Sequence, residues 1–161
     1  MSKNRRSATS PSNRWLYYLI IILFLFFYFQ SEEEGTYLVV RVIDGDTIEL
    51  SNGEKVRYIG IDTPELHHPQ KEVERYAREA YEANRRMVEG KRVRLELDVE
   101  ERDRYGRILA YVYVDDLMVN EWLVANGYAR VATFPPNVKY TERFLQLERE
   151  ARQEKIGLWA D

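Results

Sequence analysis

The chain has 161 residues, of which 45% are apolar and 32% charged, and its formal net charge at pH 7 is −3. This composition is that of a globular protein rather than a disordered one, and the length suits one folded domain with a short appendage. The sequence has no cysteine and only two histidines, adjacent at His67 and His68. It therefore excludes disulfides, a cysteine nucleophile and a lipid-modified cysteine anchor, and disfavours the common zinc sites.

The first 36 residues differ in composition from the rest. Residues 1–14 are polar and basic, which predicts a disordered tail, and an unbroken apolar and aromatic run extends from Trp15 to Phe29. At about 1.5 Å per residue this run spans roughly 22 Å, so flanking residues must help it to cross a hydrocarbon core of ~30 Å. We expect residues 15–30 to be a transmembrane signal anchor and residues 31–36 to be a charged linker.

The charges around the apolar run predict its orientation. Basic residues precede the run and Glu32, Glu33 and Glu34 follow it. By the positive-inside rule the tail stays cytoplasmic and the domain that follows is extracytoplasmic, in a single-pass membrane protein. A secretory signal peptide has similar features, so secretion after signal cleavage is the alternative, although residues 29–32 contain no small-x-small cleavage site.

The remainder of the chain is net acidic. The first 34 residues hold four of the 24 basic and three of the 27 acidic residues, which leaves the rest with a formal charge of −4. A negative domain does not attract nucleic acid through its overall charge. Any phosphate recognition must therefore depend on locally clustered arginines and a bound cation.

From residue 37 onward the pattern predicts one domain, residues 37–161, with five strands and three helices. β-Branched and alternating segments predict strands over 37–43, 47–50, 93–97 and 108–114, and the hairpin signal Asn52-Gly53 leads into a strand over 55–61. Apolar residues at helical spacing predict helices over 72–89 and 118–126 and a last helix with Thr141 as its N-cap.

Five strands with a helix inserted after the third match a known small architecture. It is the five-stranded Greek-key β-barrel of the oligonucleotide-binding (OB) fold. The fold class is therefore a β-barrel with helices (α+β), with three helices, preceded here by a single hydrophobic N-terminal helix.

Two acidic clusters carry the strongest chemical signal. Residues 44–47 read Asp-Gly-Asp-Thr and residues 62–65 read Asp-Thr-Pro-Glu, with Arg57 between them and Arg107 downstream. Carboxylates packed closely repel one another unless a cation lies among them, and arginines suit an anionic substrate. The combination predicts a metal-and-phosphate site and metal-assisted cleavage of a phosphodiester. A plain Asp-Gly turn is the alternative for residues 44–47, and it can coexist with metal binding.

Several stretches resemble the staphylococcal nuclease, or thermonuclease, family in order and spacing, and together they cover most of residues 39–159. They are residues 42–47, 56–65, 79–80, 103–112, 119–121 and 127–129. The resemblance implies a calcium-dependent endonuclease that hydrolyses DNA and RNA, with a monomeric catalytic domain.

The resemblance also implies a metal site made of oxygen ligands. Asp46, Asp62 and the backbone carbonyl of Thr63 match the ligand positions, with Asp44 behind them. Calcium suits such a site because it takes six to eight oxygen ligands at about 2.3 to 2.6 Å, which leaves places for water and a phosphate oxygen.

The remaining matched residues would act on the substrate. In the family picture Glu65 orients or deprotonates the attacking water, and Arg57 and Arg107 hold the phosphate, since a guanidinium can grip two oxygens at once. Tyr105 matches a tyrosine that lines the substrate, and Arg104 stands where the family commonly has a lysine near the terminal phosphate.

The chain departs from the family at residues 131–136, Val-Ala-Thr-Phe-Pro-Pro. The family often has tyrosines here, so one or both stacking rings are missing, with Phe134 as a partial substitute. Stacking is worth about 1 to 3 kcal/mol per base. The alternative function is a catalytically inactive, membrane-tethered OB-fold module that binds nucleic acid, but such a binder has no need of a water-activating Glu65.

Overall fold

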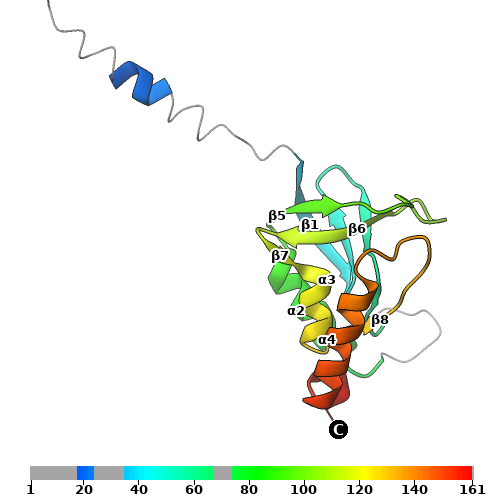
Figure 1. Cartoon of the computed structure of the whole chain (residues 1–161). Helices are drawn as coiled ribbons and strands as arrows, with labels where there is room; N and C mark the ends of the chain where they lie inside the picture. Colours follow the sequence, from blue (N-terminus) through cyan, green and yellow to red (C-terminus); the bar gives the residue numbers. More distant parts are fainter. Residues whose placement is uncertain (1–17, 24–34, 67–73, 161) are drawn as a thin grey trace, which may run out of the picture. The chain divides into compact units, whose positions relative to one another are not determined.

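The computed structural model describes residues 18–23, 35–66 and 74–160. The chain divides into two compact units, Met1–Glu34 and Gly35–Asp161. In the first unit residues 18–23 are helical (Figure 1). The predicted tail and most of the predicted anchor and linker lie outside the described residues. Within the described part of the chain, no helix is long and apolar enough to cross a bilayer.

The second unit is built around a closed barrel of five strands (Figure 1). Neighbouring strands in the order β3-β2-β1-β5-β6 pair antiparallel, and a parallel pairing of β3 with β6 closes the barrel. This arrangement confirms the predicted OB-fold barrel. The barrel strands are β1 (Thr36–Asp44), β2 (Thr47–Leu50), β3 (Lys55–Tyr58), β5 (Arg92–Glu96) and β6 (Ile108–Val114). Three short strands accompany them: β4 (Ile61–Asp62), β7 (Leu117–Met118) and β8 (Arg130–Val131).

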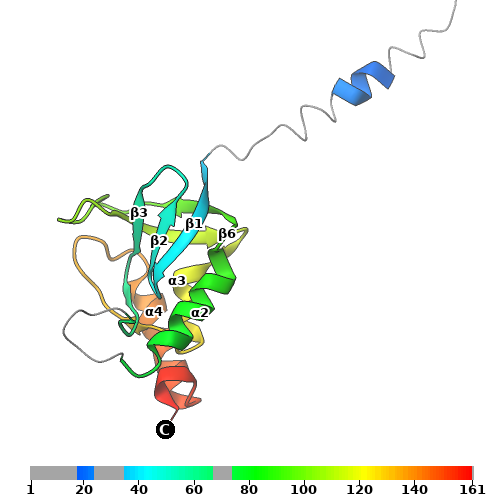
Figure 2. The same ribbon diagram turned by 180° about the vertical axis from the view of Figure 1, so that it is seen from behind.

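Three helices gather at one end of the barrel (Figures 1 and 2). They are α2 (Ala77–Val88), α3 (Val119–Ala125) and α4 (Thr141–Gln153), and a 3₁₀ turn, η1 (Gly157–Trp159), follows α4. Leu123 of α3 and Phe144 of α4 are fully buried in the same core as the inward side chains of the strands, such as Val39 and Val56. Among the described residues after position 37, the three α-helices agree with the predicted number.

The strand predicted over residues 55–61 is wrong in its extent, because β3 ends at Tyr58. Gly60 has φ +78°, which an extended strand cannot accommodate, and a Cβ on it would lie 2.9 Å from the ring of Phe144. The chain turns there and continues as β4, which pairs with β8. A straight strand would separate residues 57 and 62 by roughly 16 Å, whereas the turn brings their side chains into contact.

Two predicted helix starts also differ from the structure. A helix was predicted over residues 72–89, but α2 begins at Ala77 and the described residues 74–76 before it are not helical. Tyr76 has a left-handed conformation with φ +73°, which cannot continue a right-handed helix. Thr141 is the first residue of α4 and not its N-cap; Tyr140 holds that position without a side-chain capping bond. The Thr141 hydroxyl instead lies 3.4 Å from the hydroxyl of Thr133.

A buried amide fixes the turn after β3 to the rest of the fold. Asn120 of α3 is fully buried, and its Oδ1 accepts a 2.9 Å hydrogen bond from the backbone N–H of Val112. Its Nδ2 donates to the carbonyl of Ile59 at 2.9 Å. Buried polar groups without partners are costly, so these bonds hold α3, β6 and the end of β3 in one arrangement. That arrangement sets the position of Arg57.

Candidate active site

Arg57 is the centre of the predicted site. It projects from β3 with its side chain 17% exposed, and its guanidinium reaches acidic groups on both sides. Nη1 lies 2.9 Å from Oδ2 of Asp46, and Nη2 donates to Oδ1 of Asp62 at 2.9 Å. Nη1 also donates to the carbonyl of Ile61 at 3.0 Å. The structure therefore brings Asp46, Arg57 and Asp62 into direct contact.

The buried carboxylate of Asp46 joins the two acidic clusters. Asp46 is 5% exposed, and its Oδ2 accepts hydrogen bonds from the backbone N–H and the hydroxyl of Thr63, at 2.9 and 3.0 Å. Its Oδ1 accepts from the hydroxyl of Thr47 at 3.0 Å. The approach is close because residue 45 is glycine, where a Cβ would lie 2.6 Å from Oγ1 of Thr63. The Asp-Gly-Asp turn thus serves to bring residues 62–65 against residue 46.

Asp62 is the more exposed of the two predicted carboxylate ligands. Its side chain is 57% exposed, and partial burial, together with the negative charges of Asp46, Glu65 and Glu74, raises the pKa of its carboxyl against the opposing effect of Arg57. The negative charges around Asp62 thus repel its charged form even with Arg57 beside it. A cation bound at Asp62 would relieve that repulsion.

The predicted metal ligands are of the right chemical type for a hard cation, but they are few. Asp46 and Asp62 supply carboxylate oxygens and Thr63 a backbone carbonyl, which are ligands that calcium accepts. Among the described residues, no group of three or more His, Cys, Asp or Glu side chains is arranged to hold a metal ion. Water or substrate oxygens would have to complete the coordination. His67 and His68 lie outside the described residues.

Glu65 and Asp44 are the other two acids of the predicted clusters. Glu65 follows Asp62 in an exposed loop, and its carbonyl accepts a 3.3 Å hydrogen bond from the backbone N–H of Glu74. Asp44, at the end of β1, accepts the N–H of Gly45 with its own Oδ1 at 2.9 Å. The carbonyl of Asp44 accepts from Nδ2 of Asn84 at 3.2 Å, so α2 supports the turn from behind.

Arg107 is held in place by an acid four residues before it. Nε of Arg107 donates to Oδ2 of Asp103 at 2.7 Å, and Oδ1 of Asp103 accepts the backbone N–H groups of Tyr105 and Arg107. Burial disfavours the charged form of Asp103, but these hydrogen bonds outweigh it and lower the pKa of its carboxyl. The bond uses Nε alone, so both terminal nitrogens of Arg107 have no hydrogen-bond partner among the described residues.

Arg104 and Tyr105 sit on the exposed side of the same loop. Nη2 of Arg104 donates to the hydroxyl of Tyr105 at 2.6 Å, and its guanidinium lies 4.7 Å from the centre of that ring. The guanidinium of Arg107 lies 5.6 Å from the centre of the same ring. The ring of Tyr105 is therefore oriented by two arginines.

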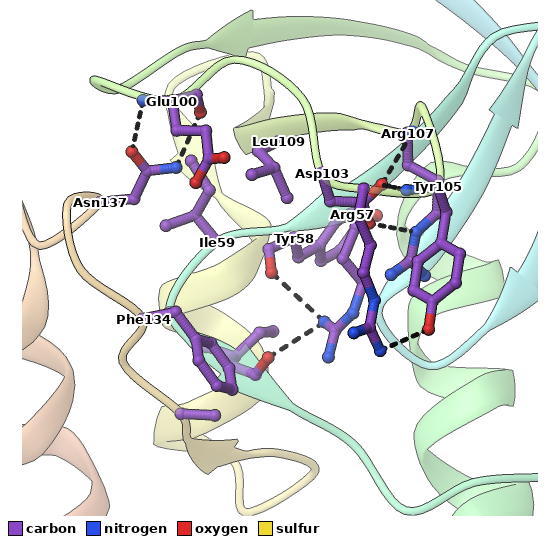
Figure 3. Close-up of a pocket in the computed structure, with 14 residues that line it drawn as sticks. Arg57, Tyr58, Ile59, Glu100, Asp103, Tyr105, Arg107, Leu109, Phe134 and Asn137 are labelled. Atoms are coloured by element: carbon purple, nitrogen blue, oxygen red, sulfur yellow. Dashed lines mark hydrogen bonds and ion pairs between the residues drawn. The ribbon is translucent and has the colours of Figure 1, made fainter.

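A cavity of about 420 Å³ connects these groups (Figure 3). Arg57, Arg104, Tyr105 and Arg107 line it, as predicted for residues that meet a substrate. The lining of the cavity does not include the predicted acids and their neighbour, which are Asp44, Asp46, Asp62, Thr63 and Glu65. Arg57 links these groups to the cavity, because it lines the cavity and also contacts Asp46 and Asp62. The roles assigned to these residues stay predictions.

A family model described as Staphylococcal nuclease homologue matches residues 55–161. The chain belongs to this family. Thermonuclease from Staphylococcus hyicus is 44% identical over 131 residues, which span 80% of this chain and 78% of that protein. Thermonuclease from Staphylococcus intermedius is 43% identical over 77% of this chain and 76% of its own length. Endonuclease YncB from Bacillus subtilis (strain 168) is 45% identical over 74% of this chain and 59% of its own length.

Sequence reasoning missed several residues of this member of the family. Asp103 had no role of its own in the sequence prediction, whereas it orients Arg107 in the structure. The run Asp-x-Tyr-Gly-Arg could have indicated it, because an aspartate often accepts the backbone N–H two residues on. The cavity is also lined by residues to which the sequence prediction assigned no role: Ile59, Glu100, Leu109, Ala132 and Asn137.

The two acids bound to Arg57 are expected to affect stability in opposite ways. Asp46→Asn should lower the free energy of unfolding by about 3 kcal/mol, because it removes the buried charge partner of Arg57. Asp62→Asn should leave that free energy unchanged or raise it at pH 7, since a raised carboxyl pKa means that folding disfavours the charged form. As the pH falls through the raised pKa, the folded wild type becomes neutral at this position and the difference should shrink, and it should vanish below the lower carboxyl pKa of the unfolded chain.

Urea unfolding in a chelating buffer, at pH 7 and at low pH, measures both effects. If both variants lose the same free energy of unfolding at pH 7, Asp62 stabilises Arg57 as much as Asp46 does and this interpretation is wrong.

Proposed function

We propose that this chain is a nuclease that hydrolyses phosphodiester bonds of DNA and RNA as a monomer, at the cavity formed by Arg57 and Arg107. The observation that carries the proposal is the meeting of two arginines from β3 and from the loop before β6 in one cavity, with paired carboxylates directly behind Arg57. The thermonuclease and endonuclease relatives support it.

The two arginines have different freedom in this proposal. Arg57 is fixed by Asp46, Asp62 and a carbonyl, so it presents a preorganised positive charge. Arg107 is anchored through Nε alone, which leaves its two terminal nitrogens to hold two oxygens of a phosphate. Fixed donors that face the phosphate stabilise the charge that builds up during attack by water.

Glu65 is the group that accepts the proton of the attacking water. It lies close enough to Asp62 to raise the pKa of that carboxyl, and it stands on an exposed loop where water has access.

Calcium is the cofactor in this proposal, and Asp46, Asp62 and the carbonyl of Thr63 are the groups that would hold it. Their oxygens suit a hard cation. Burial first, and then the negative charges of Asp46, Glu65 and Glu74, raise the pKa of the Asp62 carboxyl, so positive charge is wanted there. When bound, the ion supplies positive charge to the phosphate and to the water. Asp44 would support these ligands through the turn that it caps.

Removal of Arg107 should abolish most of the cleavage. Arg107→Ala is expected to lower kcat on single-stranded DNA and on RNA by roughly 100- to 1,000-fold, the usual loss when one donor to the transition state is removed. The rates are measured on labelled oligonucleotides of each kind. Arg143→Ala is the matched control, because Arg143 lies on α4 and pairs with Glu121. If the wild type binds the oligonucleotides without cutting them, the non-catalytic binding module is the better description.

Calcium dependence is tested by stability as well as by cleavage. Added calcium should raise the melting temperature of the wild type, because a ligand that binds only the folded state stabilises it, and a chelator should stop cleavage. Asp62→Asn should lose the calcium-dependent rise, whereas Asp116→Asn, an exposed acid before β7, should keep it. An equal rise in both variants would place the ion elsewhere.

Residues 15–30 are proposed to anchor the chain in a membrane, with the nuclease domain extracytoplasmic. The support is the uninterrupted apolar run and the basic residues before it. Full-length protein should remain in the membrane pellet after a high-salt wash, and a variant that lacks residues 1–34 should be released. Protein in the medium that has lost its first 30 or so residues would favour the secreted alternative.

A further inference from the structure

The cavity extends beyond the arginines to a part that the proposed chemistry does not use. Figure 3 shows Glu100 and Asn137 at one side of the cavity and Arg57, Arg107 and Tyr105 at the other, with Phe134 below. Between them the lining is apolar and includes Ile59, as is usual where a flat ring is bound. A nucleotide with its phosphate at the arginines would extend its base into this part.

Glu100 is held in a fixed position at the far side. Its backbone N–H donates to Oδ1 of Asn137 and its carbonyl accepts from Nδ2 of Asn137, both at 2.8 Å. Asn137 is only 4% exposed, so this pair of hydrogen bonds between its side-chain amide and the Glu100 backbone is shielded from water. The side chain extends from the fixed backbone toward Ile59 (Figure 3). Its carboxylate has no hydrogen-bond or ion-pair partner among residues 35–66 and 74–160.

The neighbouring acid on the same loop faces elsewhere. Glu101 lines a separate cavity with Tyr37, Leu95 and Arg102. Because Glu100 and Glu101 have the same charge and adjacent positions, a difference between their effects reports on the cavity and not on the net charge of the loop.

A carboxylate at this place restricts what can bind. It repels a second phosphate, and an ionised carboxylate can only accept hydrogen bonds. The edges of cytosine, adenine and guanine carry an amino group, whereas the corresponding edge of uracil or thymine presents carbonyl oxygens on both sides of its N–H. Phe134 is 73% exposed and lines the same cavity, so its ring is available to stack on an unpaired base.

We propose that Glu100 is a specificity-determining residue, which makes the cavity select nucleotides whose base carries an amino group over those with uracil or thymine. The inference rests on the proposed function, because it takes the phosphate to lie at Arg57 and Arg107. Stacking on Phe134 supplies affinity without distinguishing cytosine from uracil, and the Glu100 carboxylate supplies the distinction.

Binding of two homodinucleotides tests the inference without turnover. The 5′-phosphorylated dinucleotides of deoxycytidine and deoxyuridine have rings of equal size, and using the same base twice makes the result independent of which one enters the cavity. Calorimetric titration of the wild type should give a Kd for the cytosine compound about 5-fold or more below that for the uracil compound, the discrimination of one good hydrogen-bond contact to a base edge.

Glu100→Gln, which offers both a donor and an acceptor, should bring this ratio close to one, and Glu100→Ala should do the same. Glu101→Gln should keep the wild-type ratio. Equal affinities in the wild type, or a ratio that Glu100→Gln leaves unchanged, overturn the inference. Cleavage of single-stranded DNA is measured in parallel: cleavage with equal affinities refutes this inference alone, and cytosine-selective binding without cleavage refutes the proposed activity alone.

Discussion

The site depends on the partial burial of Arg57 between two carboxylates. A guanidinium with its side chain 17% exposed needs compensating charge and acceptors, and Asp46, Asp62 and the carbonyl of Ile61 provide them. These partners come from the turn before β2, from β4 and from the segment after Gly60. The ion pairs of Arg57 therefore require the sharp turn at Gly60. That turn is held by the ring of Phe144, which packs against it, and by the hydrogen bond from Asn120 to the carbonyl of Ile59. The charge centre and the helical end of the core stabilise each other.

The sequence was sufficient for the barrel because each strand carries its own signal. The segments around Val39, Ile48 and Val112 are rich in β-branched residues and place Val39, Ile48 and Val112 in the core, and the Asn52-Gly53 hairpin joins β2 to β3 as predicted. The turn at Gly60 was missed because its cause is distant in the sequence: Phe144 lies 84 residues further on. The two-residue strands β4 and β8 are too short for periodicity to indicate, and they form only because they pair with each other.

Within the site, the sequence predicted that the acids of the two motifs lie together. It did not predict which way the acidic side chains of the loop before β6 point. Glu100, Glu101 and Asp103 form one charge run in the sequence, yet the first faces the arginine cavity, the second faces another cavity and the third binds Arg107. A loop has neither the period of a strand nor that of a helix, so alternation cannot assign its side chains. Their directions are set by tertiary bonds, of which the Asn137 pair with the Glu100 backbone is the clearest.

The distribution of charge explains how a domain with a net negative charge could bind a polyanion. Positive charge is concentrated where Arg57, Arg104 and Arg107 line the cavity, while Glu100 and the cluster around Asp62 place negative charge on either side of it. At physiological ionic strength, interactions are screened beyond about 8 Å, so a phosphate responds to these near charges and not to the overall charge. In the proposed function one phosphate would bind at the arginines, between two regions that repel its neighbours. The register of the backbone would then be set before any base is read.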